Sequence, residues 1–335
     1  MLNSRSFLLI IIIEIICFTA GNVSVYAESV SENADDHEMY QCTVSLKTFD
    51  EQKIITRFFG DKKIQRTDNE SNETSVIQCE NALLTISKGS LDFQNDEQAG
   101  IEGDILFDPD LPVEGNANPD ENAEVQDLAS WLREVCVSSD EEQLDMIHVE
   151  SYESPKLREQ LDQIGKVDTF LSDMMDENTF KDYQEFTKVE YELSFGGVPL
   201  LGGDEPGPSF YLDIAPPMYV IMQGLFGDGN LLYLNIEGIF DVISSEEVSL
   251  ISQSEAEKNA KEALLTASPE NENVVFQEKK LEYVLLPDWE TESMWPTRMV
   301  PYWYFMYEKV DEDGYSSQYP VRINAITGGN MTYGE

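Results

Sequence analysis

The chain has 335 residues, of which 65 are acidic and 21 are basic, so its formal net charge at pH 7 is −44. Such an acidic surface repels phosphate backbones and anionic lipid headgroups, which argues against nucleic-acid binding and electrostatic membrane binding. With 41% hydrophobic and 10% aromatic residues, the chain holds enough apolar material to fold and is not a disordered acidic tail.

Basic residues are missing from two long stretches. No Lys or Arg occurs between Lys88 and Arg133, or between Lys188 and Lys258. This pattern has two readings that the sequence leaves open. The acidity either serves solubility in an extracellular milieu, or it suits a cationic partner or metal ions.

Residues 1–27 have the pattern of a signal peptide. Arg5 supplies a positive n-region, residues 7–18 form an apolar stretch, and Val25-Tyr26-Ala27 is a small-residue cleavage site. We expect cleavage before Glu28 and a secreted or extracytoplasmic protein. If the segment is not cleaved, it is long enough to anchor the chain in a membrane, and we expect no other membrane contact.

The next segments predict a small domain and a linker. Residues 28–37 are polar and predicted to be a flexible leader. Strand-like alternation in MYQCTVSLKTF, KIITRFF and SVIQCENALLTISKGSLDF predicts a small, mostly β domain over residues 38–106. Pro, Gly, Asn and acidic residues then mix without periodicity, which predicts an acidic linker over residues 107–120.

Three cysteines follow the predicted cleavage site. Cys42 and Cys79 lie in strand-like stretches of the small domain, so a disulfide between them is our candidate pair, although spacing alone does not establish it. Cys136 lies in a helix-like segment beside apolar residues. We interpret it as a buried residue rather than a nucleophile.

Residues 121–248 predict an α+β module. Apolar residues recur at helical spacing from Val125 to Val135, a strand and a second helix follow, and β sequence then continues almost without a break. MYVIMQGL and LLYLNIEGIF flank FGDGN, which predicts a hairpin whose positive φ angles are supplied by Gly227, Asp228, Gly229 and Asn230.

Residues 249–335 predict a second module of the same kind. Ser252 and Glu255 form a capping box before a helix with an apolar stripe, and three strands follow. The sequence therefore predicts an α+β fold with tandem helix-plus-antiparallel-sheet modules behind a small, mostly β N-terminal domain.

Four segments of the C-terminal unit carry a family resemblance. Residues 250–256 open the helix, residues 281–283 and 301–305 form paired strands, and residues 322–329 close the unit. Together they resemble a PepSY-type module, whose usual ending is DA-x-TG; here Asn324 stands where an Asp is usual.

Residues 191–200 resemble the strand and turn of a divergent preceding PepSY-like copy. The resemblance implies an extracytoplasmic, non-catalytic module of the sort found in peptidase propeptides, membrane-associated regulators and cell-envelope accessory proteins. It names no ligand.

Motifs for catalysis are missing from the sequence. There is no HExxH, CxxC or G-x-S-x-G, and the chain has only two histidines, His37 and His148. We interpret His148 as a structural strand residue and predict no catalytic residues and no cofactor. The alternative is a secreted hydrolase that uses two carboxylates, one of them with a raised pKa.

Calcium is the metal that the sequence suits best. Hard oxygen ligands crowd one loop, but their order does not match an EF-hand, so the competing interpretation is a solvated acidic linker. These residues are Asp108, Asp110, Glu114, Asn116, Asn118, Asp120 and Glu121.

An aromatic cluster is our candidate binding surface. On a strand, alternate members point to opposite faces, and the single predicted helix covers only one face. The other face either packs against the neighbouring module or binds a cell-envelope protein, peptide or glycan. The cluster consists of Trp289, Trp295, Tyr302, Trp303, Tyr304, Phe305 and Tyr307.

The sequence as a whole predicts an exported, non-enzymatic binding or regulatory accessory protein of the cell envelope. The export signal, the missing catalytic motifs and the C-terminal resemblance lead to this prediction. The carboxylate-dependent hydrolase stays open beside it.

Overall fold

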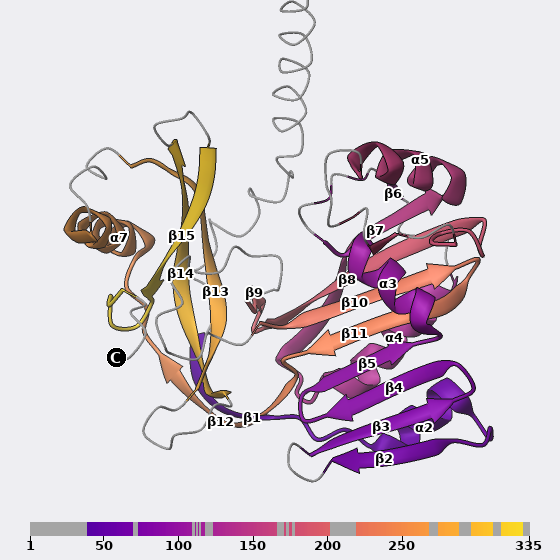
Figure 1. The fold of residues 1–335 in the computed structure, drawn as a ribbon. Coiled ribbons are helices and arrows are strands. Elements are labelled where there is room, and N and C mark those ends of the chain that lie inside the picture. Colours follow the sequence, from indigo (N-terminus) through magenta and orange to yellow (C-terminus); the bar gives the residue numbers. More distant parts are fainter. Residues whose placement is uncertain are drawn as a thin grey trace, which may run out of the picture.

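Two antiparallel β-sheets organise the chain in the computed structural model (Figure 1). The predicted signal peptide and leader lie outside the residues that the structure describes. Those residues are 39–69, 73–108, 111, 113, 115–117, 123–165, 171, 174–175, 178–201, 219–267, 274–287, 296–310 and 316–330.

Within these residues the larger sheet has ten strands. Their order is β2-β3-β4-β5-β11-β10-β8-β7-β6, and β9 pairs with β8. The strands are β2 (Gln65–Asn69), β3 (Thr74–Cys79), β4 (Ala82–Ser87), β5 (Ser90–Gln94), β6 (Asn116–Ala117), β7 (Glu142–Glu153), β8 (Glu185–Phe195), β9 (Val198–Pro199), β10 (Ile221–Gly227) and β11 (Asn230–Glu237).

The smaller sheet has five described strands in the order β12-β1-β14-β13, with β15 paired to β14. The 15-residue strand β14 pairs with β1 near its start and with β15 over its second half. The strands are β1 (Met39–Leu46), β12 (Phe240–Val248), β13 (Phe276–Pro287), β14 (Pro296–Val310) and β15 (Ser316–Asn324).

Helices cover both faces of the larger sheet. Helices α2 (Glu51–Phe59) and α4 (Ala123–Cys136) bury their apolar residues on one face, behind the sheet in Figure 1. Helices α3 (Glu97–Leu106) and α5 (Ser154–Ile164) pack on the opposite face. The smaller sheet carries α7 (Gln253–Ala267).

The two sheets share one hydrophobic core. Tyr283 of β13 packs edge-to-face on Phe195 of β8, with ring centroids 5.7 Å apart, and Tyr40 of β1 contacts the same ring at 6.3 Å. Burying one such side chain contributes about 1.5–3 kcal/mol. The core therefore joins the N-terminal, central and C-terminal parts of the chain.

The predicted tandem arrangement is wrong. The molecule is β-rich, and its strands form two large sheets instead of consecutive helix-plus-sheet modules. Strand β12 lies in the segment expected to be the first module, yet it pairs with β1 in the sheet that contains β13–β15. Strand pairing across the chain decided the architecture, and local periodicity carries no information about it.

The strands expected to form a small N-terminal domain have no sheet of their own. Strand β1 pairs with β12 and β14, whereas β5 pairs with β11, so β2–β5 extend the ten-stranded sheet. Strands β3, β4 and β5 each offer a buried face with period two. Such a face can be completed by any strand that brings a matching face.

The segment KIITRFF forms a helix rather than the predicted strand. The carboxylate of Asp50 caps α2 by accepting a hydrogen bond from the Lys53 amide at 3.1 Å, and Gly60 ends the helix with φ 57°. Ile54, Ile55 and Phe59 then lie on one buried face. The capping residues outweighed the β propensity of the two isoleucines.

The hairpin and the C-terminal helix confirm their predictions. Strands β10 and β11 pair around Asp228 and Gly229, both at positive φ (46° and 80°). The Ser252 hydroxyl accepts a hydrogen bond from the Glu255 amide at 3.2 Å at the start of α7, and Ala256, Ala260 and Leu264 are buried.

Candidate functional site

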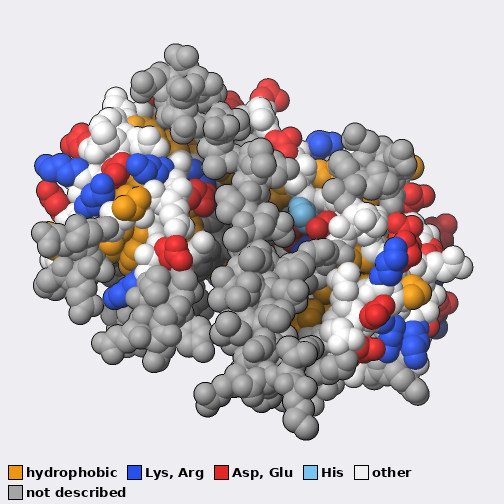
Figure 2. Space-filling view, turned by 90° about the horizontal axis from the view of Figure 1, so that it is seen from above, with side chains coloured by type: hydrophobic (Ala, Val, Ile, Leu, Met, Phe, Trp, Pro, Cys, Tyr) orange, Lys and Arg blue, Asp and Glu red, His pale blue; other side chains and the backbone are white. Residues whose placement is uncertain are grey.

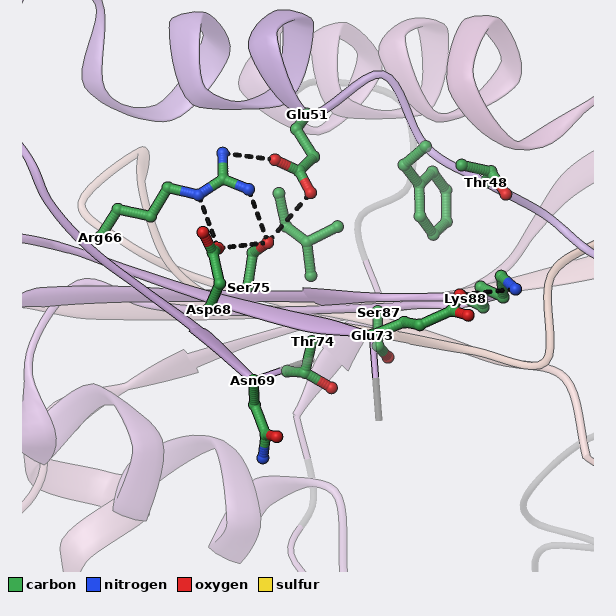
Figure 3. Close-up of a pocket in the computed structure, with 12 residues that line it drawn as sticks. Thr48, Glu51, Arg66, Asp68, Asn69, Glu73, Thr74, Ser75, Ser87 and Lys88 are labelled. Atoms are coloured by element: carbon green, nitrogen blue, oxygen red, sulfur yellow. Dashed lines mark hydrogen bonds and ion pairs between the residues drawn. The ribbon is translucent and has the colours of Figure 1, made fainter. Parts of the chain in front are cut away.

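A polar pocket of about 280 Å³ lies under the start of α2, beside the β2 edge of the larger sheet (Figure 3). We call it the α2 pocket. Its walls come from the segment that leads into α2, from β2 and β3, and from the end of β4. Phe49 and Ile86, both buried, supply apolar carbon to the lining.

Local structure places the polar side chains of this pocket. The Asp50 cap positions Glu51 in the first turn of α2, where the helix dipole favours a carboxylate. Arg66 and Asp68 are two residues apart on β2, so they share a face of the strand. Ser75 on β3 lies within hydrogen-bonding distance of all three of these side chains.

The Arg66 guanidinium is the centre of the network (Figure 3). Its Nε donates to Asp68 Oδ1 at 2.6 Å, its Nη1 contacts Glu51 Oε2 at 2.7 Å, and its Nη2 donates to Ser75 Oγ at 3.0 Å. The Ser75 Oγ in turn lies 3.0 Å from Glu51 Oε1 and 3.1 Å from Asp68 Oδ1. A second ion pair, Lys88 with Glu73 at 2.5 Å, closes another part of the wall.

The pairs set the electrostatics of the α2 pocket. The hydrogen bond from Arg66 lowers the pKa of the Asp68 carboxyl, and the same bond raises the pKa of the guanidinium. Both groups remain open to solvent, with side-chain exposures of 54% and 42%. The Asp68 and Glu51 carboxylates thus share one cationic partner, and the exposed atoms of Asp68 and Arg66 stay accessible to a ligand.

A smaller cavity of about 170 Å³ lies where the two sheets meet. We call it the inter-sheet cleft; Glu190, Glu192 and Gln223 of the larger sheet and Lys280 and Glu282 of β13 line it. Gln223 Nε2 donates to Glu190 Oε1 at 3.4 Å.

Two carboxylates of the inter-sheet cleft, Glu190 and Glu282, have cationic partners. Lys188 Nζ lies 3.4 Å from Glu190, and Arg322 Nε donates to the buried Glu282 at 2.5 Å. The inter-sheet cleft is thus lined by ion-paired carboxylates and by apolar side chains.

On the molecular surface the few basic residues lie among acidic ones. Figure 2 shows Lys and Arg side chains next to Asp and Glu side chains on the face that it draws. Lys279 pairs with Glu257 at 2.7 Å. Hydrogen bonds from Lys261 and from Lys279 lower the pKa of the Glu257 carboxyl.

The described members of the aromatic cluster are buried and form no exposed groove. Strand β14 is paired along both edges, and each of these side chains is at most 9% exposed. Because consecutive residues of a strand point to opposite faces, both faces of β14 are covered. Trp289 and Trp295 lie outside the described residues. The buried members are Tyr302, Trp303, Tyr304, Phe305 and Tyr307.

The predicted disulfide is not formed. Cys42, Cys79 and Cys136 are buried free thiols. Cys42 lies on β1 in the smaller sheet and Cys79 lies on β3 in the larger one. Burial raises the pKa of the Cys42 and Cys136 thiols to about 12.

The described residues contain neither a metal-binding cluster nor a helix that could span a membrane. Across the described residues, no cluster of three or more His, Cys, Asp or Glu side chains could hold a metal ion. Most of the candidate calcium loop, including Asp110 and Asp120, lies outside these residues. Within the same part of the chain, every helix is too short or too polar to span a bilayer.

Sequence reasoning did not single out Arg66, Ser75 or Glu51. A signal was present in QRTDN, where a cation and an anion two residues apart must share one face of a strand. That signal does not reveal Glu51 or Ser75, because α2 and β3 approach β2 only in the folded chain.

His148 lies on β7, as predicted, and its Nε2 is 3.2 Å from Glu150 Oε2. Hydrogen bonding to this carboxylate raises the pKa of the imidazole. The strand register places His148 opposite Glu190, which lines the inter-sheet cleft.

Comparison with known proteins identifies a similar fold. No family model matches the chain, and no curated protein matches it. The crystal structure of an uncharacterised protein from Eubacterium rectale ATCC 33656 is similar, with a TM-score of 0.52 and 11% sequence identity. The match covers 88% of this chain and 86% of that one. At this identity the similarity concerns the fold alone.

Proposed function

We propose that the chain is an exported, non-enzymatic binding or regulatory accessory protein of the cell envelope, and that its ligand occupies the α2 pocket. The observation that carries this proposal is the Arg66 network. It presents a guanidinium, two carboxylates and a hydroxyl in one open pocket, fixed in place by 2.6–3.1 Å contacts. Such preorganised polar groups reduce the entropy lost on binding.

The distribution of carboxyl pKa values favours binding over two-carboxylate hydrolysis. A hydrolase of that kind needs one carboxyl with a raised pKa and one ordinary carboxyl in the same cavity. Burial raises the pKa of Asp92 to about 6 and that of Glu102 to about 7, and it also raises those of Asp104 and Glu142. None of these four residues lines the α2 pocket or the inter-sheet cleft.

We also propose that the protein is extracytoplasmic and that its C-terminal part is PepSY-like. The export signal of residues 1–27 supports an extracytoplasmic location, and the C-terminal segments support a PepSY-like origin. The net charge of −44 supports a partner other than nucleic acid or anionic lipid.

Retention on isolated cell envelopes tests the proposal. The wild-type chain and its Glu51→Gln variant are incubated with the envelope fraction, and bound protein is measured after washing. We expect Glu51→Gln to weaken retention about tenfold, because a hydrogen bond to a charged group contributes about 1.5 kcal/mol or more. Glu97→Gln, which removes an exposed first-turn carboxylate of α3, is the matched control and leaves retention unchanged.

Equal retention of the wild type and Glu51→Gln would contradict a role for the α2 pocket. A separate measurement, N-terminal sequencing of the exported protein, would support cleavage of the signal peptide if the mature chain begins at Glu28.

A further inference from the structure

The α2 pocket also indicates the chemical class of its ligand. Resting on the function proposed above, we propose that the α2 pocket binds a neutral, polyhydroxylated ligand, a short glycan segment, through hydrogen bonds to Glu51, Asp68 and Ser75. Three features of the pocket indicate this class of ligand. Its charged side chains are already paired with one another, the Ser75 hydroxyl has one proton for two carboxylates, and the rest of the lining includes hydroxyl groups and apolar carbon.

The ion pairs disfavour an ionic ligand. Arg66 contacts both carboxylates at 2.6 and 2.7 Å, and Lys88 pairs with Glu73 at 2.5 Å. An anion would have to compete with Glu51 and Asp68 for the guanidinium, and a cation would have to compete with the guanidinium for the carboxylates. A neutral ligand binds without breaking any of these three ion pairs.

The Ser75 hydroxyl leaves a place for a ligand donor. Its oxygen lies 3.0 Å from Glu51 Oε1 and 3.1 Å from Asp68 Oδ1, and it also accepts a hydrogen bond from Arg66 Nη2. A hydroxyl has a single hydrogen, so Ser75 donates to one carboxylate oxygen at a time. The other oxygen can accept a hydrogen bond from a ligand hydroxyl, a group that sugar rings carry at several positions.

The solvent exposure of the α2 pocket and the chemistry of its lining also agree with a glycan ligand. The side chains of Glu51 and Asp68 are 34% and 54% exposed, so a ligand reaches them from solvent. Ser75 is only 6% exposed and contacts both carboxylates from the buried side of the pocket. Thr48 and Ser87 add hydroxyls to the lining. Phe49 and Ile86 provide apolar carbon against which the C–H face of a sugar ring can pack.

The size of the pocket limits the ligand. Its volume of about 280 Å³ lies at the lower end of the range of about 300–1,000 Å³ for drug-sized ligands. The pocket therefore accommodates a short segment, and the rest of a longer glycan would lie along the exposed strand β2.

Calorimetric titration of the intact exported chain tests this inference. The probes are neutral β-linked and α-linked glucose and mannose oligosaccharides, an anionic oligogalacturonide and a cationic chitosan oligomer. We expect a neutral oligosaccharide to bind, with a Kd that changes less than about twofold between about 0.1 M and 1 M salt, while the Debye length falls from about 10 to about 3 Å.

Three variants locate the binding site. Glu51→Gln and Ser75→Ala should each weaken binding of the neutral probe about tenfold, because each removes part of the acceptor and donor set. Thr67→Ala removes a hydroxyl from the same strand as Arg66 and Asp68, but on the opposite face, and should leave the Kd unchanged. Because Glu51 is partly exposed, Glu51→Gln keeps the test decisive if Ser75→Ala fails to fold.

Two outcomes would overturn the inference: binding of only charged probes with strong salt dependence, or no binding of any neutral oligosaccharide. Either outcome is distinguishable from failure of the proposed function. If envelope retention still depends on Glu51 when neutral probes fail, the pocket binds a ligand of another class; if retention is independent of Glu51, the pocket assignment itself fails.

Discussion

At the scale of single residues, Glu102 of α3 is a carboxyl inside the core. Only 2% of it is exposed, and its Oε1 accepts a hydrogen bond from the Phe180 amide at 2.6 Å. Burial raises its pKa from 4.5 to about 7, and the nearby carboxylates of Asp96 and Asp182 act in the same direction. Phe180 itself is buried with φ 59°, so this bond holds a residue in the left-handed region.

The raised pKa predicts how stability depends on pH. The folded chain binds this proton more tightly than the unfolded chain, so the contribution of Glu102 is fully present below about pH 4.5 and is lost as pH rises through about 7. Glu102→Gln keeps the acceptor oxygen without the charge. We expect it to raise the free energy of unfolding by about 3 kcal/mol near pH 8 and to leave it unchanged near pH 4, as measured by urea denaturation.

Glu97→Gln, on the exposed side of the same helix, is the control and should show no such pH-dependent difference. A Glu102→Gln protein that is less stable than the wild type near pH 8 would contradict the raised pKa.

Two glycines of α3 differ in the space around them. A Cβ at Gly103 would lie 2.7–2.9 Å from the ring of the buried Tyr233, whereas one at Gly100 would meet the amide end of Gln94, a flexible side chain. Alanine in a helix is favoured over glycine by about 1 kcal/mol. We expect Gly100→Ala to stabilise the protein by up to about that amount, and Gly103→Ala to destabilise it by about 1–3 kcal/mol through overpacking.

Thermal unfolding of the two glycine variants measures the difference. Equal melting temperatures would show that Tyr233 can move away from an added methyl group.

At the scale of elements, the turn and capping residues at the ends of helices and strands proved more informative than hydrophobic periodicity. The residues from Gly227 to Asn230 correctly predicted the β10–β11 hairpin, and of these Asp228 and Gly229 adopt the positive φ that the turn requires. Helix α2 was missed, although Asp50 and Gly60 frame it, because the central isoleucines suggested a strand. A short apolar segment can form either a helix or a strand, so the residues at its two ends decide which one it forms.

The turn after β15 carries the motif that suggested the PepSY-like resemblance. Asn324 Oδ1 accepts hydrogen bonds from the amides of Ile326 and Thr327, both at 2.9 Å. Asn259 of α7 donates to the Gly328 carbonyl at 3.1 Å, which ties this turn to the helix. The motif therefore has a structural role at this position.

Substitution of Asn324 tests that role. Asn324→Ala leaves two amides without their acceptor and should lower the free energy of unfolding by about 1–3 kcal/mol. Asn324→Asp retains a carboxylate oxygen in the same position and should lower it much less. Chemical denaturation compares the two variants, and an equal loss in both would assign the effect to something other than these hydrogen bonds.

At the scale of the whole molecule, pairings between distant strands decide the architecture. Strand β1 pairs with β12 about 200 residues later, and Tyr40 donates its amide hydrogen to the Tyr283 hydroxyl at 3.1 Å. The segment predicted as the C-terminal module therefore shares both its sheet and its core with the N-terminal strand.

This sharing predicts the behaviour of a fragment. Residues 249–335 expressed alone lack β1 and β12, and the face of Tyr283 that packs on Phe195 becomes exposed. We expect the fragment to show poor dispersion of amide NMR signals and no cooperative thermal transition, because an uncovered edge and an incomplete core are unstable. Residues 38–335 serve as the folded control, and a cooperative transition of the short fragment would show that it is an independent module.

The amino-acid sequence alone determined local features: the extreme acidity, the turn between Gly227 and Asn230, the start of α7 at Ser252, and the strand-forming character of most segments. These depend on each residue and its near neighbours. Only the tertiary structure decided which strands pair, that the aromatic residues of β14 are core, and that Glu51, Arg66, Asp68 and Ser75 meet in one pocket. A strand with one apolar face accepts many partners, and the choice among them depends on the free energy of the complete core.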